Sequence, residues 1–228
     1  ATVRNARGEN YPSPLRAALL AQKNGADSVT IHLREDRRHI NENDLNKIKN
    51  KIKIPLNLEI AATEEMLRIA SRSKPPFICI VPEKRKEITT EGGLNLKHNR
   101  PFLKRLINNL KKKKIRISLF IEPNLKDIKE AKNLNADCIE IHTGKICNLI
   151  NMNKNFSNEL KRIKKAVKEG NKLGLEVHAG HGLTFKSAKT LKKVKGIEEF
   201  NIGHFLVGES IFQGMSSVIK NFKKILKS

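Results

Sequence analysis

The sequence contains no tryptophan, a single tyrosine and three cysteines among its 228 residues. It therefore lacks the interleaved aromatic side chains on which nucleic-acid bases usually stack. The cysteines, Cys79, Cys138 and Cys147, show no spacing typical of a metal site, and the first two lie in apolar runs where a reduced cysteine acts as a small hydrophobic residue. This usage suits a reducing compartment, and we expect a cytoplasmic protein.

Long apolar runs and acidic residues are also scarce. No run of about 18 apolar residues occurs, so no membrane-spanning helix is predicted, and no secretory signal pattern is present. The 46 Lys and Arg residues against 23 Asp and Glu give a net charge of +23. Most of the excess is lysine spread over helical segments, which indicates solvated faces and attraction of anionic substrates. A basic nucleic-acid-binding protein is the alternative that this charge leaves open.

The sequence does contain a regular alternation of short β-rich runs and helical patterns. Runs rich in Ile, Val, Leu or Phe predict strands at residues 28–33, 56–61, 77–82, 115–122, 138–143, 175–179 and 199–203. Helices are predicted at residues 13–25, 43–51, 63–71, 101–113, 125–134, 157–173, 186–194 and 210–226. Such alternation predicts a parallel sheet with helices outside it.

The number of strands bears on the fold class. A (β/α)8 TIM barrel needs eight parallel strands, and seven are visible here. Residues 1–8 are predicted to be a loop leading into the first helix, and the chain begins with Ala1 instead of Met. We therefore expect an α/β fold, with one TIM-barrel domain over residues 1–228. In this interpretation the first strand preceded Ala1 and the chain is truncated at its N-terminus.

Histidines and glutamates gather at the predicted strand ends. In one strand Ile139 and Ile141 alternate with Glu140 and His142, so one face would pack on helices and the other would point inward. Inward Glu and His side chains are costly unless they are paired or functional. Six of the seven histidines follow this placement or lie in the next loop: His32, His39, His142, His178, His181 and His204. Active sites of barrel enzymes lie at that rim, which favours acid–base catalysis; a metal site that includes His178 and His181 is the weaker alternative, because no HExxH motif occurs.

Glycines and arginines at the same rim indicate phosphate binding. Residues 179–184 and 201–210, at the ends of the last two predicted strands, contain glycines that let backbone N–H groups approach an anion. Arg34, two residues past the strand-end His32, is the arginine that we expect to bind phosphate. Arg37 and Arg38 suit an exposed, salt-bridged loop. The polar stretch 82–93 suits either a lid or a simple mobile loop.

Eight motifs, in order along the chain, resemble those of the pyridoxine 5′-phosphate synthase family. They are RNARG (4–8), HLREDRRHI (32–40), NLE (57–59), VPEKR (81–85), TTEGGL (89–94), EIHTG (140–144), AGHGL (179–183) and NIGH (201–204). HLREDRRHI together with VPEKR and TTEGG is the most specific combination. Another phosphosugar-binding barrel enzyme would share the fold but would not account for this combination.

The resemblance implies an enzyme that condenses 3-amino-2-oxopropyl phosphate with 1-deoxy-D-xylulose 5-phosphate. The products would be pyridoxine 5′-phosphate, inorganic phosphate and water, formed without a metal or organic cofactor. The resemblance also implies small phosphorylated substrates and a homo-oligomer, typically an octamer, with no nucleic-acid or membrane partner.

Residue roles follow from the same resemblance. The catalytic residues would be two bases, His32 and Glu59, a proton donor, His181, and a group that stabilises the transition state, Glu140. The deoxyxylulose phosphate would be bound by Arg34, His39 and Thr89. The aminooxopropyl phosphate would be bound by Gly182, Gly203 and His204, and Arg7 would be a further substrate-binding residue. Two departures stand out: the family's first strand, NIDHI, would precede Ala1, and His178 occupies a position where Asn or a similar residue is expected.

Overall fold

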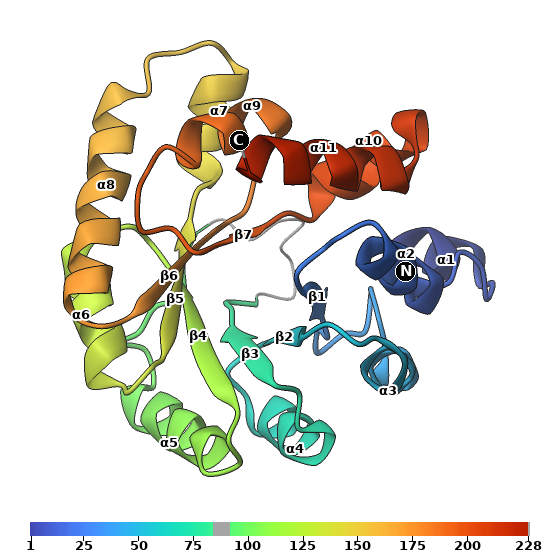
Figure 1. The fold of residues 1–228 in the computed structure, drawn as a ribbon. Helices are drawn as coiled ribbons and strands as arrows, with labels where there is room; N and C mark the ends of the chain where they lie inside the picture. Colours follow the sequence, from blue (N-terminus) through green and yellow to red (C-terminus); the bar gives the residue numbers. More distant parts are fainter. Residues whose placement is uncertain (84–91, 228) are drawn as a thin grey trace.

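The computed structural model describes residues 1–83 and 92–227 of the chain. Within these ranges, seven parallel strands curve into a nearly closed barrel, with helices on its outside (Figure 1). The strands are β1 (Val29–His32), β2 (Leu56–Ile60), β3 (Phe77–Ile80), β4 (Arg116–Ile121), β5 (Cys138–His142), β6 (Glu176–Gly180) and β7 (Glu199–Asn201). Each strand pairs with the next one in sequence, so the order is β1 to β7. The predicted barrel class is confirmed, and an eighth strand before Ala1 stays a prediction.

Each of the seven predicted strands is present, and helices alternate with them. After the short α1 (Thr2–Arg7), these are α2 (Pro14–Lys23), α3 (Glu42–Lys51), α4 (Glu64–Ser73), α5 (Arg100–Lys111), α6 (Leu125–Asn133), α7 (Gly144–Asn151), α8 (Ser157–Lys172), α9 (Phe185–Leu191), α10 (His204–Gln213) and α11 (Met215–Lys227). Several begin at a residue whose side-chain oxygen accepts a hydrogen bond from the backbone N–H three residues on. Ser13, Asn41, Thr63, Asn124 and Thr184 are such N-caps.

The expectation of a loop at residues 1–8 is wrong, because residues 2–7 form α1. None of its residues is buried, so no apolar periodicity marks it in the sequence. Its stability comes from polar contacts instead. The two terminal guanidinium nitrogens of Arg4, Nη1 and Nη2, donate to the Asp44 carboxylate on α3, at 2.8 and 2.7 Å. The helix ends at Gly8, whose φ of 66° is a left-handed conformation that glycine adopts without strain.

The prediction of a single helix at residues 210–226 is also wrong. The chain forms two helices there, α10 and α11, which meet at Gly214 with a φ of 74°. The helical periodicity continues across this glycine, and the sequence alone does not show the break. The short helix α7, directly after β5, was not predicted either.

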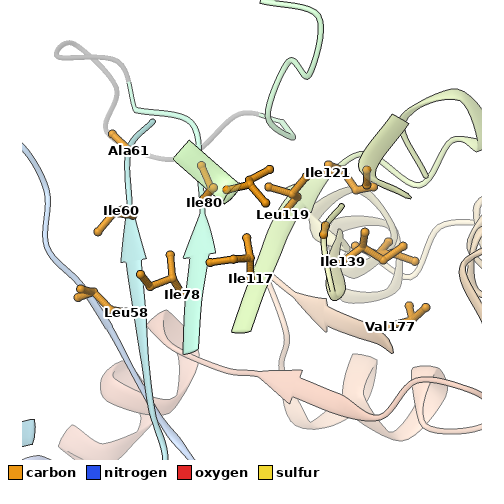
Figure 2. Packing of buried hydrophobic residues seen from close by; sticks show 14 of the residues in the cluster. Leu58, Ile60, Ala61, Ile78, Ile80, Ile117, Leu119, Ile121, Ile139 and Val177 are labelled. Atoms are coloured by element: carbon orange, nitrogen blue, oxygen red, sulfur yellow. The ribbon is translucent and has the colours of Figure 1, made fainter. Parts of the chain in front are cut away.

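Alternate residues of the strands form the outer core. Figure 2 shows buried side chains from β2 to β6, among them Leu58, Ile78, Ile117, Ile139 and Val177, none of which is exposed to solvent. Burying one such side chain stabilises the fold by roughly 1.5–3 kcal/mol. Because strand side chains alternate between faces, the intervening residues point into the barrel, where the candidate site lies. Among the described residues, no helix combines the length and apolar character needed to cross a bilayer.

Candidate active site

The first part of the site joins the ends of β1 and β2. His32 and Glu59 are neighbours in the parallel register, and His32 Nδ1 lies 3.7 Å from Glu59 Oε2. On its other side, His32 Nε2 lies 2.8 Å from Oε1 of Glu83, just past β3. Desolvation raises the pKa of Glu59, while the positive charge of His32 lowers it. The imidazole is therefore flanked by two carboxyl groups with which it can exchange protons.

The second part centres on Glu140, in the middle of β5. Its carboxyl group is buried, and Oε2 accepts a hydrogen bond of 2.8 Å from Nδ2 of Asn201 on β7. The Oδ1 atom of Asn201 accepts in turn from Thr30 Oγ1 on β1, at 3.0 Å. Burial raises the pKa of Glu140 well above its usual value, and the nearby negative charge of Glu59 raises it further. A buried carboxyl group of this kind holds its proton and can donate a hydrogen bond.

The third part lies just past the end of β6, where His181 has a φ of 76°. This left-handed backbone is uncommon for a residue with a side chain, and such strain gathers at functional sites. Thr143 Oγ1 supports it by donating to the carbonyl oxygens of Gly180 and His181, at 2.7 and 2.8 Å. Burial lowers the pKa of His181, and the neighbouring His142 and His204 lower it further. The neutral imidazole is thus favoured.

Two glycine-containing turns lie beside these groups. Gly182 follows His181 with a φ of 76°, and Gly203 precedes α10, whose first residue is His204. The first turn of a helix has N–H groups without intrahelical partners, and these suit an anion. A Cβ at Gly203 would meet no atom within 4 Å, so the backbone there is open to approach. This geometry can bind a phosphate group.

The loop after β1 contributes the other predicted phosphate-binding residues. Arg34 is buried and bonds to Asp36 at 3.3 Å, and a cavity of about 190 Å³ opens beside Arg34 and Glu83. The ring of His39 lies 6.4 Å from that of His32, so the loop folds back toward the strand end. Arg37 and Arg38 form salt bridges to acidic residues within and beyond the loop, as expected.

The two remaining predicted substrate-binding residues are Arg7 and Thr89. Arg7 lies exposed at the end of α1, and the structure does not bring it into the group around Glu59 and Glu140. Thr89 and most of the stretch predicted as a lid or loop fall within residues 84–91, outside the described residues.

A larger hollow of about 520 Å³ runs along the outer face of α5, beside Arg100 and Lys104, away from the strand ends.

The alternative metal site is not assembled as drawn from the sequence. His178 Nε2 lies 2.8 Å from Oε1 of Glu176, at the start of β6, whereas His181 is at the strand's other end. The described residues do bring Cys138, Glu176 and His178 together, with donor atoms within 4.8 Å of one another. Arg116 forms a salt bridge with Glu176 there.

Sequence reasoning missed several residues that touch the predicted ones. Glu83 bonds to His32, and Glu122 bonds to His142 at 2.8 Å. Asn201 donates to Glu140 and accepts from Thr30. Thr30 and Glu122 occupy inward positions of the strand alternation, which was the available signal. The contact of Glu83 depends on the path of the chain after β3, and no local pattern indicates that path.

A nearly closed barrel of parallel strands, with histidines, glutamates and glycine turns at one rim, defines a TIM-barrel-type enzyme. The family model described as "Pyridoxal phosphate biosynthesis protein PdxJ" matches residues 1–228, and the chain belongs to this family. It is an enzyme of pyridoxal phosphate biosynthesis.

Two relatives agree with this assignment. A protein of Pelagibacter ubique (strain HTCC1062) is 58% identical over 225 residues, covering 99% of this chain and 94% of the relative. One of Syntrophotalea carbinolica is 49% identical over 226 residues, covering 99% and 94%. Both are named pyridoxine 5′-phosphate synthase.

The solved structures share the fold alone. Phosphoribosylanthranilate isomerase of Thermotoga maritima superposes with a TM-score of 0.63 at 16% identity, covering 94% of each chain. KGPDC of Streptococcus mutans gives 0.65 at 11% identity, covering 93% of this chain and 91% of that one.

Proposed function

We propose that this enzyme condenses 3-amino-2-oxopropyl phosphate with 1-deoxy-D-xylulose 5-phosphate. The products are pyridoxine 5′-phosphate, inorganic phosphate and water. Membership of the PdxJ family and the names of its relatives support this reaction. The observation that carries the acid–base mechanism is the convergence of Glu59 and Glu140, both with raised pKa values, beside His32 inside one barrel.

The roles divide between proton acceptors and donors. Joining an amine to a ketone, losing water and phosphate and closing a ring require repeated proton transfers. His32 and Glu59, 3.7 Å apart, act as the bases. His181, whose lowered pKa makes its protonated form a stronger acid, acts as the proton donor. Glu140 keeps its proton through burial and stabilises negative charge that develops in the transition state.

The two phosphate groups bind at opposite sides of this group. Gly182, Gly203 and His204 bind the aminooxopropyl phosphate through backbone N–H groups at the start of α10. The deoxyxylulose phosphate is bound by Arg34 and His39, together with Thr89. The family resemblance alone supports Arg7 as a further substrate-binding residue, since its side chain is exposed at the end of α1. No metal or organic cofactor is needed in this scheme.

The chain forms one domain that assembles into a homo-oligomer. One cluster of buried hydrophobic residues extends from Ala18 to Val194, which supports a single domain over residues 1–228. Val207, Ile211 and Phe212 on α10 are more than half exposed, and such apolar side chains suit a subunit interface. Size-exclusion chromatography with light scattering measures the mass of the assembly. A monomer at all concentrations would contradict the homo-oligomer.

The direct test is product formation from the two phosphates, with Glu59→Gln as the diagnostic variant. Gln keeps the shape of the side chain but cannot accept a proton, so we expect kcat to fall by roughly a hundredfold or more. Thermal unfolding should change little. Glu130→Gln, on the outer helix α6, is the matched control and should keep wild-type turnover.

Two outcomes would contradict the proposal. Unchanged turnover in Glu59→Gln would remove Glu59 from the mechanism. Salt-sensitive retention on DNA, with no product from the two phosphates, would favour the nucleic-acid-binding alternative.

A further inference from the structure

His142, at the end of β5, has no role in the proposed function, yet it is firmly held. Its Nδ1 atom lies 2.8 Å from Oε1 of Glu122, just past β4. Glu122 also accepts hydrogen bonds of 3.3 Å from the Gly93 backbone N–H and from Arg162 on α8. The pKa of Glu122 is lowered to about 2, chiefly by the hydrogen bond to His142. An ionised carboxylate therefore fixes the imidazole with its Nδ1–H turned toward Glu122.

The other ring nitrogen of His142, Nε2, lies on the side of the ring that faces His181. His142 Nε2 is buried and has no hydrogen-bond partner among the described residues. The two ring centroids are 4.9 Å apart. A Cβ at Gly144 would lie 2.8 Å from His142 Nε2 and 3.0 Å from His181 Cδ2, so the rings approach each other where Gly144 has no side chain. A buried unpaired nitrogen in a folded protein calls for an explanation beyond packing.

We propose that His142, held by Glu122, is a positioning residue that sets the orientation and protonation of His181. The catalytic meaning of this inference rests on the proposed role of His181 as proton donor. The contact between the two rings does not depend on that role. Glu122, His142 and His181 form a series in which a charged carboxylate fixes one imidazole and that imidazole constrains the next.

The groups around His181 determine the direction in which its pKa should change when His142 is replaced. His142 on β5 and His204 on α10 both disfavour its positive charge, in addition to burial. Phe120 on β4 contributes a ring 6.4 Å away, which carries no charge. Thr143 holds only the backbone of His181. Removing the imidazole of His142 therefore removes one of the groups that disfavour protonation of His181, while the Glu122 carboxylate remains, and the pKa of His181 should rise.

Nuclear magnetic resonance of histidine-labelled full-length protein tests this, with the His181 signals assigned from a His181→Asn variant. In His142→Gln we expect His181 to titrate about one pH unit higher, a tenfold change in its protonation equilibrium. In Glu122→Gln both rings remain but the anchor is lost, so the ring resonances of His181 should move. The limb of the pH–rate profile that belongs to the proton donor should shift to higher pH in His142→Gln.

Glu176→Gln is the matched control, because Glu176 also bonds a histidine and an arginine but lies at the start of β6. It should leave the His181 titration unchanged. Equal titration of His181 in the wild type and His142→Gln, or unmoved His181 resonances in Glu122→Gln, would overturn the inference. If the variants show these shifts but the wild type makes no product, the proposed function is refuted and the coupling between the two histidines stands.

Discussion

Gly180 shows at the scale of one residue how the site depends on close approach. It ends β6 beside His142 of β5 and Asn201 of β7. A Cβ built there would lie 1.8 Å from Oε1 and 2.7 Å from Cδ of Glu140. The Glu140 carboxyl group therefore occupies the space that a side chain at residue 180 would need, and it accepts the hydrogen bond from Asn201 in that position.

Gly180→Ala should displace the Glu140 carboxyl group and break its bond to Asn201. We expect kcat to fall at least tenfold, and unfolding free energy to fall by about 1–3 kcal/mol from overpacking. Steady-state kinetics and denaturant unfolding measure the two effects. Gly208→Ala is the control, because a Cβ there meets nothing within 4 Å. It should keep turnover and, as a helix position, gain up to about 1 kcal/mol. Similar kinetics in both variants would refute this account of Gly180.

The sequence predicts the strand residues of the site better than the loop residues. His32, Glu59 and Glu140 follow from alternation, since inward positions of parallel strands must meet inside a barrel. The partner of His32, Glu83, lies past a strand end, so its position depends on tertiary contacts. The φ of 76° at His181 is likewise set by its surroundings, here the hydrogen bonds from Thr143, and it leaves no signal in the sequence.

At the scale of one element, α1 holds part of the loop after β1. Asn5 Nδ2 donates to the carbonyl oxygens of Arg38 and His39, at 3.0 and 2.6 Å. Thr2 Oγ1 lies 3.0 Å from His39 Nδ1. Arg4 fastens the helix to α3 through Asp44. The helix thus holds His39 in place, one of the residues proposed to bind the deoxyxylulose phosphate.

Asn5→Ala should loosen the backbone at residues 38–39 without touching the catalytic groups. We expect KM for 1-deoxy-D-xylulose 5-phosphate to rise by up to about tenfold, which corresponds to roughly 1.4 kcal/mol and matches the upper range for a lost hydrogen bond. The kcat value should change little, since the acid–base groups stay in place. Val3→Ala, at a side chain that is 64% exposed on the same helix, is the control. A fall in kcat with unchanged KM would contradict this role of α1.

Element boundaries were predictable where a local signal exists. Ser13 and Thr63 begin two of the predicted helices, and in the structure they are the N-caps of α2 and α4. Helix α1 was missed because its stability comes from Asp44, some forty residues away in the sequence. The junction of α10 and α11 was missed because a glycine within a helical pattern is compatible with both continuation and a break.

At the scale of the whole molecule, the barrel separates the carboxyl groups of the candidate site from most of the lysines. The carboxyl groups of Glu59 and Glu140 lie inside the sheet, while the lysines lie mainly on the outer helices. Strand–helix alternation was enough to predict this layering, because a parallel sheet must be covered by helices. The sequence did not show how the seven strands would close, since curvature arises from packing over the whole sheet.

The net charge of +23 should assist capture of substrates that carry phosphate groups. An excess of positive charge raises the encounter rate with anions, and salt screens it over about 10 Å at 0.1 M ionic strength. We therefore expect kcat/KM to fall several-fold as potassium chloride is raised, while kcat at saturating substrate stays nearly constant, because steering acts on encounter and not on chemistry. As a control, trehalose, an uncharged solute, replaces potassium chloride at matched viscosity. It should not produce the fall in kcat/KM that salt produces. If kcat/KM is independent of salt, the charge does not serve substrate capture, and the lysines are a compositional feature of solvated helix faces.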